Sequence, residues 1–293
     1  MMKAKTVFRA MVLVSLCALV AGPATGAMYP GYVLQDGNSM VAVSFSNGVE
    51  RWDVDGFSHL GDEGDEALQW FWYRTGLTGP EQRVDPTNLD FDAAASLSSD
   101  SNGDGADDTV YMLYHDGLGR FDVEVTLTLD GGPVGTDNSD LAEQITVTNT
   151  GNDPLDFHFF QYADFDLGGM ADDDAVTYIG KAVNGVDEVM VVKQTSDEHM
   201  LVAADVASVP LAHTEANTDG ALRLELDDAA ADDLNDSTAA AGDVEWAGQW
   251  DVELAPGEAF QLSKDKMITP EPATLALLGG GAAVALFLRR RRR

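Results

Sequence analysis

The sequence has almost no cysteine and few basic residues, and both scarcities exclude classes of function. Cys17 is the only cysteine among the 293 residues, and it lies in the N-terminal apolar stretch. Disulfides, a thiol nucleophile and cysteine metal sites are therefore excluded from the rest of the chain. Eight of the 17 basic residues lie at the two ends, which leaves nine against 49 acidic residues between Met28 and Pro270. Such a charge repels phosphates, so we expect no nucleic-acid partner.

The sequence also lacks recognisable catalytic and nucleotide-binding motifs. No nucleophile elbow, phosphate loop or dinucleotide fingerprint stands out between the two chain ends. The histidines lack the close spacing of metal ligands, and His158, in an aromatic stretch, reads as a packed or surface residue. From these absences we expect the protein not to be an enzyme. The histidines concerned are His59, His115, His158, His199 and His213.

The N-terminus has the three parts of a secretory signal peptide. Three basic residues come first, Ala10–Val20 is an apolar stretch too short to span a membrane comfortably, and small residues follow up to Ala27. This order predicts export, with cleavage after Ala27 and residues 1–27 removed as a signal helix.

The C-terminus combines a proline-rich tripeptide, an apolar run and a basic end. Pro270-Glu271-Pro272 precedes the run Ala273–Leu288, which as a helix would be about 24 Å long against a hydrocarbon core of about 30 Å. We expect a single transmembrane helix with its basic end in the cytoplasm. The orienting residues are Arg289, Arg290, Arg291, Arg292 and Arg293.

Together these features resemble the PEP-CTERM sorting signal, over about residues 268–293 and in combination with the export signal. The resemblance implies that exosortase, a membrane protease-transpeptidase, recognises Pro270, Glu271 and Pro272 and removes the tail. It also implies a bacterial host that makes extracellular polysaccharide, a second expected partner. The protein would sit in the inner membrane before processing. Afterwards it would belong to the cell envelope, cell surface or extracellular matrix. A plain tail anchor is the alternative.

Between the two ends the pattern is strand-like. Phe121–Leu129 alternates apolar and polar residues and is followed by the turn Asp130-Gly131-Gly132-Pro133. Many such strands predict an antiparallel β-sandwich at 28–262, a linker at 263–269 and the sorting signal at 270–293. Further expected strands are 145–148, 157–162, 188–193, 222–226, 250–254 and 259–262, and short helices are expected at 65–73 and 227–234.

One acidic loop has the spacing of a calcium site. Oxygen ligands recur at alternate positions of the segment 100–108, and Gly105 takes the sixth position, where EF-hand loops bend sharply. The loop resembles those of dockerins, but Tyr111 stands where the bidentate Glu belongs. We therefore expect weak calcium binding, with an acidic turn that holds no ion as the alternative. The predicted ligands are Asp100, Asn102, Asp104, Ala106 and Asp108.

Two other clusters have more than one interpretation. Asp164 and Asp166, with Asp172–Asp174 nearby, suit a cation site or a solvated loop better than the carboxylate pair of a glycosidase. The aromatic run Trp70–Tyr73 is more typical of core than of a sugar-stacking surface.

These observations favour a non-enzymatic surface or matrix protein that is sorted by exosortase and stabilised by calcium. A carbohydrate-binding adhesin and a carbohydrate-active enzyme on the same sandwich are the alternatives. Exposed coplanar rings would mark the adhesin, and converging carboxylates in an aromatic-lined cleft would mark the enzyme.

Overall fold

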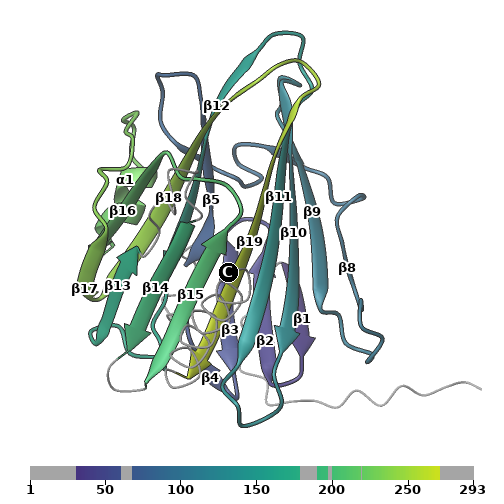
Figure 1. Cartoon of the computed structure of the whole chain (residues 1–293). Coiled ribbons are helices and arrows are strands. Elements are labelled where there is room, and N and C mark those ends of the chain that lie inside the picture. Colours follow the sequence, from purple (N-terminus) through teal and green to yellow (C-terminus); the bar gives the residue numbers. More distant parts are fainter. Residues whose placement is uncertain (1–30, 61–67, 179–189, 197–199, 219, 271–293) are drawn as a thin grey trace, which may run out of the picture.

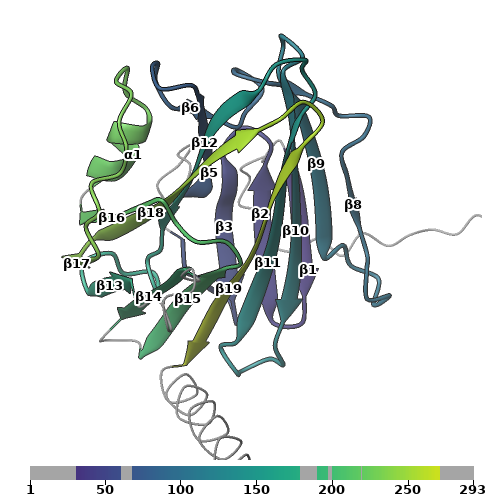
Figure 2. The same ribbon diagram turned by 45° about the horizontal axis from the view of Figure 1, so that its top comes forward.

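The computed structural model describes residues 31–60, 68–178, 190–196, 200–218 and 220–270. Two antiparallel sheets lie face to face (Figure 1), and the same layering is visible after a 45° turn (Figure 2). The expected mainly-β, antiparallel architecture is therefore confirmed. The expected signal peptide and transmembrane helix lie outside the described residues. Within the described part, no helix has the length and apolar character to cross a membrane.

Sheet A has nine strands, and its middle is formed by β5, β12 and β18. Strands close in sequence pair at one edge, whereas β12 receives β18 from the far end of the chain. Its path is β1 (Gly31–Asp36), β2 (Ser39–Ser44), β3 (Gly48–Val54), β5 (Gln69–Thr75), β12 (Leu155–Asp164), β18 (Val244–Leu254) and β16 (His213–Thr218), with β4 (Phe57–Ser58) on β3 and β6 (Gln82–Arg83) on β5.

Sheet B has ten strands, and its longest members are adjacent. Its path is β17 (Ala239–Gly242), β13 (Asp174–Tyr178), β14 (Met190–Ser196), β15 (Leu201–Ala207), β19 (Ala259–Pro270), β11 (Ser139–Asn149), β10 (Phe121–Gly131), β9 (Thr109–His115) and β7 (Asp90–Phe91), with β8 (Leu97–Ser99) on β9. The alternation that predicted β10 appears in its burial, because every second side chain points into the core.

The core between the sheets is rich in aromatic side chains. Phe71 stacks on Phe159 within sheet A, and Tyr73 meets Phe121 of sheet B edge to face with ring centroids 5.3 Å apart. Trp70 packs so closely on Gly48 (φ +78°) that a Cβ there would lie 2.2 Å from the indole ring. The preference for core over a sugar platform at Trp70–Tyr73 is confirmed, because all four side chains are buried.

The segment expected to be a strand at 222–226 is instead the short helix α1 (Ala221–Leu226). The Leu-Arg-Leu-Glu-Leu pattern fits a strand, but Leu222 and Leu226 also lie one helical turn apart. Both of these leucines are buried, whereas Leu224 is exposed. Helical packing of the outer two leucines therefore overrides the alternation.

Both expected helices are wrong wherever the structure describes them. Residues 69–73 belong to β5, whose unbroken apolar run is buried because both faces of the strand are covered. After Asp227, the C-cap of α1, residues 228–238 form no helix. They run over sheet A with Leu234 buried.

The expected linker at 263–269 is also wrong. These residues form the second half of β19, which pairs with β11 on one side and β15 on the other. Along this segment, exposed residues alternate with buried ones, which include Lys264 and Lys266. Acidic side chains in the core neutralise both lysines. The folded body therefore continues to Pro270.

Candidate functional site

A row of polar side chains lies on the face of sheet A that is turned away from sheet B. On β12, Phe159 and Gln161 face sheet B, so the alternating residue His158 faces away. Cross-strand pairing places Arg74 of β5 on one side of His158 and Asp251 of β18 on the other. The register of three strands thus brings together a guanidinium, an imidazole and a carboxylate.

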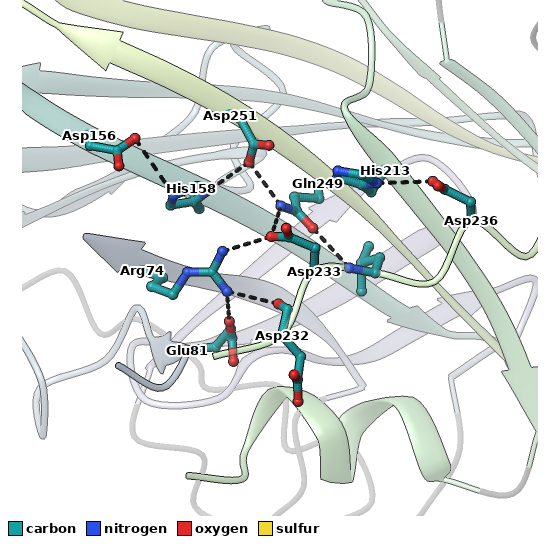
Figure 3. Close-up of polar contacts among 11 residues, drawn as sticks. Arg74, Glu81, Asp156, His158, His213, Asp232, Asp233, Asp236, Gln249 and Asp251 are labelled. Carbon is teal, nitrogen blue, oxygen red and sulfur yellow. Dashed lines mark hydrogen bonds and ion pairs between the residues drawn. The ribbon is translucent and has the colours of Figure 1, made fainter. Parts of the chain in front are cut away.

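The segment after α1 covers this row, as Figure 3 shows. Arg74 donates to the Asp232 carbonyl at 2.8 Å and to Asp233 Oδ1 at 2.7 Å. The backbone N–H of Leu234 donates to Gln249 Oε1 at 3.0 Å. We call Arg74, Glu81, His158, Asp233, Gln249 and Asp251 the His158 cluster.

Hydrogen bonds connect the two exposed carboxylates of the cluster to its buried groups. His158 Nδ1 lies 2.7 Å from Asp251 Oδ1, and Nε2 of the same ring lies 3.6 Å from Asp156 Oδ1. The Gln249 amide donates to Asp233 at 2.8 Å and to Asp251 at 2.9 Å. One amide therefore fixes the separation of the two carboxylates.

Charge and burial shift the pKa values in opposite directions. The hydrogen bond to Asp251 raises the pKa of His158, although burial opposes it. Burial alone would raise the pKa of Asp251, but hydrogen bonds from His158 and Gln249 outweigh it and lower that pKa. The Gln249 and Arg74 hydrogen bonds lower the pKa of Asp233. The cluster thus favours a protonated imidazole beside ionised carboxylates.

This arrangement suits proton transfer at an opening to solvent. His158 itself is 5% exposed, but the side chains of Asp233 and Asp251 are 51% and 34% exposed. A ligand therefore meets the two carboxylates first and the imidazole behind them. The same three residues place one ligand atom each within 4.8 Å of one another, a spacing that could also hold a metal ion.

Of the sequence-predicted sites, the calcium loop is held by its own hydrogen bonds. Asp100 accepts from the N–H groups of Gly103 and Gly105, and Asp108 accepts from Ser101 and Asn102. The backbone N–H of Asp104 donates to the Asn102 side chain, and the N–H of Ala106 donates to the Asp104 carboxylate. The loop is followed directly by β9. Calcium binding here stays a prediction.

The second acidic cluster is drawn together only in part. Asp164 and Asp166 join Asp243, with one oxygen of each within 4.8 Å of the others. Asp173 instead accepts from Ser196, and Asp174 accepts from Leu167 and Gln194. The sorting motif is described only at Pro270, the last residue of β19, and Glu271, Pro272 and the arginines lie outside the described residues.

Sequence reasoning missed the His158 cluster, and no local spacing could have revealed it. His158 and Asp251 are 93 positions apart and meet only through the pairing of β12 with β18. The available signal was the position of His158 inside an aromatic strand, where a histidine that faces away from the core needs polar partners.

Several solved structures share this fold at low sequence identity. A protein of Escherichia coli K12, provisionally assigned as an aldose 1-epimerase, shares it at a TM-score of 0.52 and 14% identity, over 81% of this chain and 98% of that one. A protein of Synechocystis sp. PCC 6803 matches at 0.52 and 11% identity, over 86% and 99%. A bacterial glucoamylase complexed with acarbose matches at 0.53 and 10% identity, over 89% of this chain but 36% of that one.

The expectation that the protein is not an enzyme is overturned, because the structures that share its fold include one provisionally assigned as an aldose 1-epimerase. No curated protein matches the chain in sequence.

A separate comparison concerns the C-terminal tail. Residues 269–293 match the PEP-CTERM protein-sorting motif, which confirms the resemblance drawn from the sequence. The motif implies export, anchoring in a membrane and processing by exosortase.

Proposed function

We propose that this chain is an exported, exosortase-sorted protein of the cell surface or extracellular matrix that interconverts the anomers of a sugar at the His158 cluster. The observation that carries the proposal is the His158–Asp251 hydrogen bond beside Asp233, on a fold shared with a protein assigned as an aldose 1-epimerase. Within this proposal the tail determines where the protein acts, and the face of sheet A determines what it acts on.

The reaction needs one acid and one base at two oxygens of the same carbon. The anomeric hydroxyl loses its proton while the bond from the anomeric carbon to the ring oxygen breaks, and the ring oxygen gains a proton. Closure on the other face of the resulting carbonyl reverses both transfers. Protonated His158 supplies the acid, and ionised Asp233 supplies the base. Nε2 of His158 is buried and lies 3.6 Å from Asp156 Oδ1, so a bound sugar must displace the Asp156 side chain to receive the proton from it. Asp251 is a positioning residue, because it holds Nδ1 and sets the orientation of the imidazole.

The surrounding groups support these assignments. Arg74 and Gln249 both donate to Asp233 and keep it ionised. Glu81 partners the other side of the Arg74 guanidinium, so that Arg74 is anchored between two carboxylates. The cluster is thus held rigidly, as proton transfer between fixed groups requires.

Anomer exchange measured by NMR on the full chain in detergent tests the proposal. We expect faster exchange of glucose, galactose or mannose anomers, and His158→Gln should lower the protein-dependent rate by about 100-fold or more. His115→Gln is the matched control, because His115 Nδ1 also lies 2.7 Å from an aspartate, Asp122, but in sheet B. Sugar binding without acceleration would instead favour a binding adhesin, and equal loss in both variants would contradict the assignment.

A further inference from the structure

A hollow of about 350 Å³ lies on the opposite side of the sandwich from the His158 cluster. On β11, Glu143 faces sheet A, where it bonds Gln69, so Ala142 and Gln144 face away from it. The hollow opens on this outer face of sheet B and spans β10, β11, β19 and β15. Its volume is at the small end of the usual range for small-molecule sites, about 300–1,000 Å³.

Strand register explains why the sheet is hollowed here. Thr128, Ala142 and Asp265 lie side by side on three neighbouring strands, and Val206 follows on the fourth. The short side chain of Ala142 stands between two longer ones and leaves a depression. The next row, Thr126, Gln144, Ser263 and Ser208, forms its other wall.

The side chains around this depression match the chemistry of a sugar. Four hydroxyls, one amide and one carboxylate surround it, and each can donate to or accept from ligand hydroxyls. The methyl groups of Ala142 and Val206 offer apolar contact for the C–H face of a ring. We propose that the hollow binds a neutral, hydroxyl-rich glycan. Glu143 and Lys264, whose side chains pair with each other in the core, also border the hollow. The polar lining residues on the outer face are Thr126, Thr128, Gln144, Ser208, Ser263 and Asp265.

The charge around the hollow decides between neutral and acidic glycans. Asp140 lies one row from Asp265, and Asp130 is its cross-strand partner on β10. Burial, and then the negative charges of Asp265 and Asp130, raise the pKa of Asp140 to about 6, which reports a negative field on this face. A uronate would be repelled, whereas a neutral sugar would not.

This site is independent of the proposed anomer interconversion, because it uses the other sheet and no residue of the His158 cluster. A chain of sugars held on sheet B would keep the protein on a polysaccharide while the face of sheet A stays open. The two proposals can therefore fail separately.

Isothermal titration of the full chain in detergent tests the hollow, with maltotetraose, cellotetraose and mannotetraose as neutral probes and trigalacturonate as the acidic one. We expect binding of at least one neutral probe, and Ala142→Ile, which fills the depression from an exposed position, should weaken it by about tenfold, or 1.4 kcal/mol. Ala259→Ile is the matched control, on an exposed position of β19 outside the hollow.

Three results would overturn the proposal: no binding of any neutral probe, equal affinity of the Ala142→Ile and parent chains, or tighter binding of trigalacturonate. Loss of neutral-probe binding in His158→Gln would move the binding site to the other sheet and would also overturn it.

Discussion

The Nζ atom of Lys266 lies 2.8 Å from Oε2 of Glu143, and both side chains are buried between the two sheets. The neighbouring Lys264 lies 2.6 Å from Asp205, which is equally buried. Gln69 and Gln161 of sheet A donate to Glu143 and Asp205 of sheet B. Ion pairs within sheet B and two amides from sheet A therefore form a polar centre in an otherwise apolar core, and the amides join the two sheets.

Removal of one lysine should leave an uncompensated charge in that centre. We expect Lys266→Met to lower the free energy of unfolding by about 3–5 kcal/mol, because buried Glu143 then loses its closest cation. Urea unfolding followed by tryptophan fluorescence measures the change. Arg51→Met is the control, since the Arg51 side chain is 41% exposed in its pair with Asp53 and the pair should contribute about 0–1 kcal/mol. A loss as small as that of Arg51→Met would show that the core centre is solvated.

Strands with a clear alternation of apolar and polar residues were predictable from the sequence. The secondary structure of segments that fit both a helical and a strand periodicity was not. Phe121–Leu129 has one polar face and one apolar face, and only a strand buries it fully. Leu222 and Leu226 fit a helix and a strand equally, so the packing of α1 on sheet A decided between them. Residues 263–269 looked like a linker because their buried lysines are polar, and only the acids of the core make them strand residues.

The candidate site was less accessible to sequence reasoning than the fold. The sorting motif is local and could be found in full, because it lies within the consecutive residues 269–293. The His158 cluster draws on β5, β12, β18 and the segment after α1, so its geometry exists only after the register of three strands is set. The hollow of sheet B depends likewise on which residues stand beside Ala142.

Stability should fall as the pH rises between about 5 and 8, because Asp164 is forced to ionise in place. Burial, followed by the charges of Asp166 and Glu245, raises its pKa from 3.8 to about 8. Between these two pKa values the folded chain holds a proton that the unfolded chain releases. The group therefore stabilises the fold at low pH and loses that contribution as the pH approaches 8.

Thermal unfolding at pH 5, 6, 7 and 8 tests this titration. The slope contributed by one such group is at most about 1.4 kcal/mol per pH unit. Asp164→Asn, which stays neutral, should flatten the decline. The remaining slope would reflect the other carboxyls whose pKa burial raises, to about 7 for Asp174 and Glu225 and to about 6 for Asp140. Asp153→Asn, at an exposed turn position, should leave the slope of the parent. A parent chain that gains stability towards pH 8 would contradict the assignment.

Calcium at the 100–108 loop should be weak and should depend on its carboxylates. With a dissociation constant of about 1 mM, typical of extracellular sites without the full ligand set, 10 mM calcium would stabilise the fold by about 1.4 kcal/mol. Asp100→Ala with Asp104→Ala should abolish the increase in melting temperature. Asp85→Ala, in another acidic turn of the chain, should retain it. An unchanged response in the double variant would place any bound calcium elsewhere.

The sorting tripeptide begins where the folded body ends, since Pro270 pairs with Leu201 as the last residue of β19. An exosortase must therefore engage a motif whose first residue is part of a paired strand. We expect the native protein, expressed in an exosortase-bearing host, to lose its C-terminal apolar run and arginines. Pro270→Ala, Glu271→Ala and Pro272→Ala combined should retain them, because the recognised residues are gone.

Intact mass of the purified protein identifies the mature C-terminus in each case. The combination of Pro154→Ala, Pro256→Ala and Glu258→Ala makes the same three types of substitution in turns away from the tail, and it should be processed as the native chain is. An intact tail in all three proteins would make the chain a permanently anchored membrane protein. Cleavage of all three would show that the apolar run and its basic end, rather than the tripeptide, direct processing.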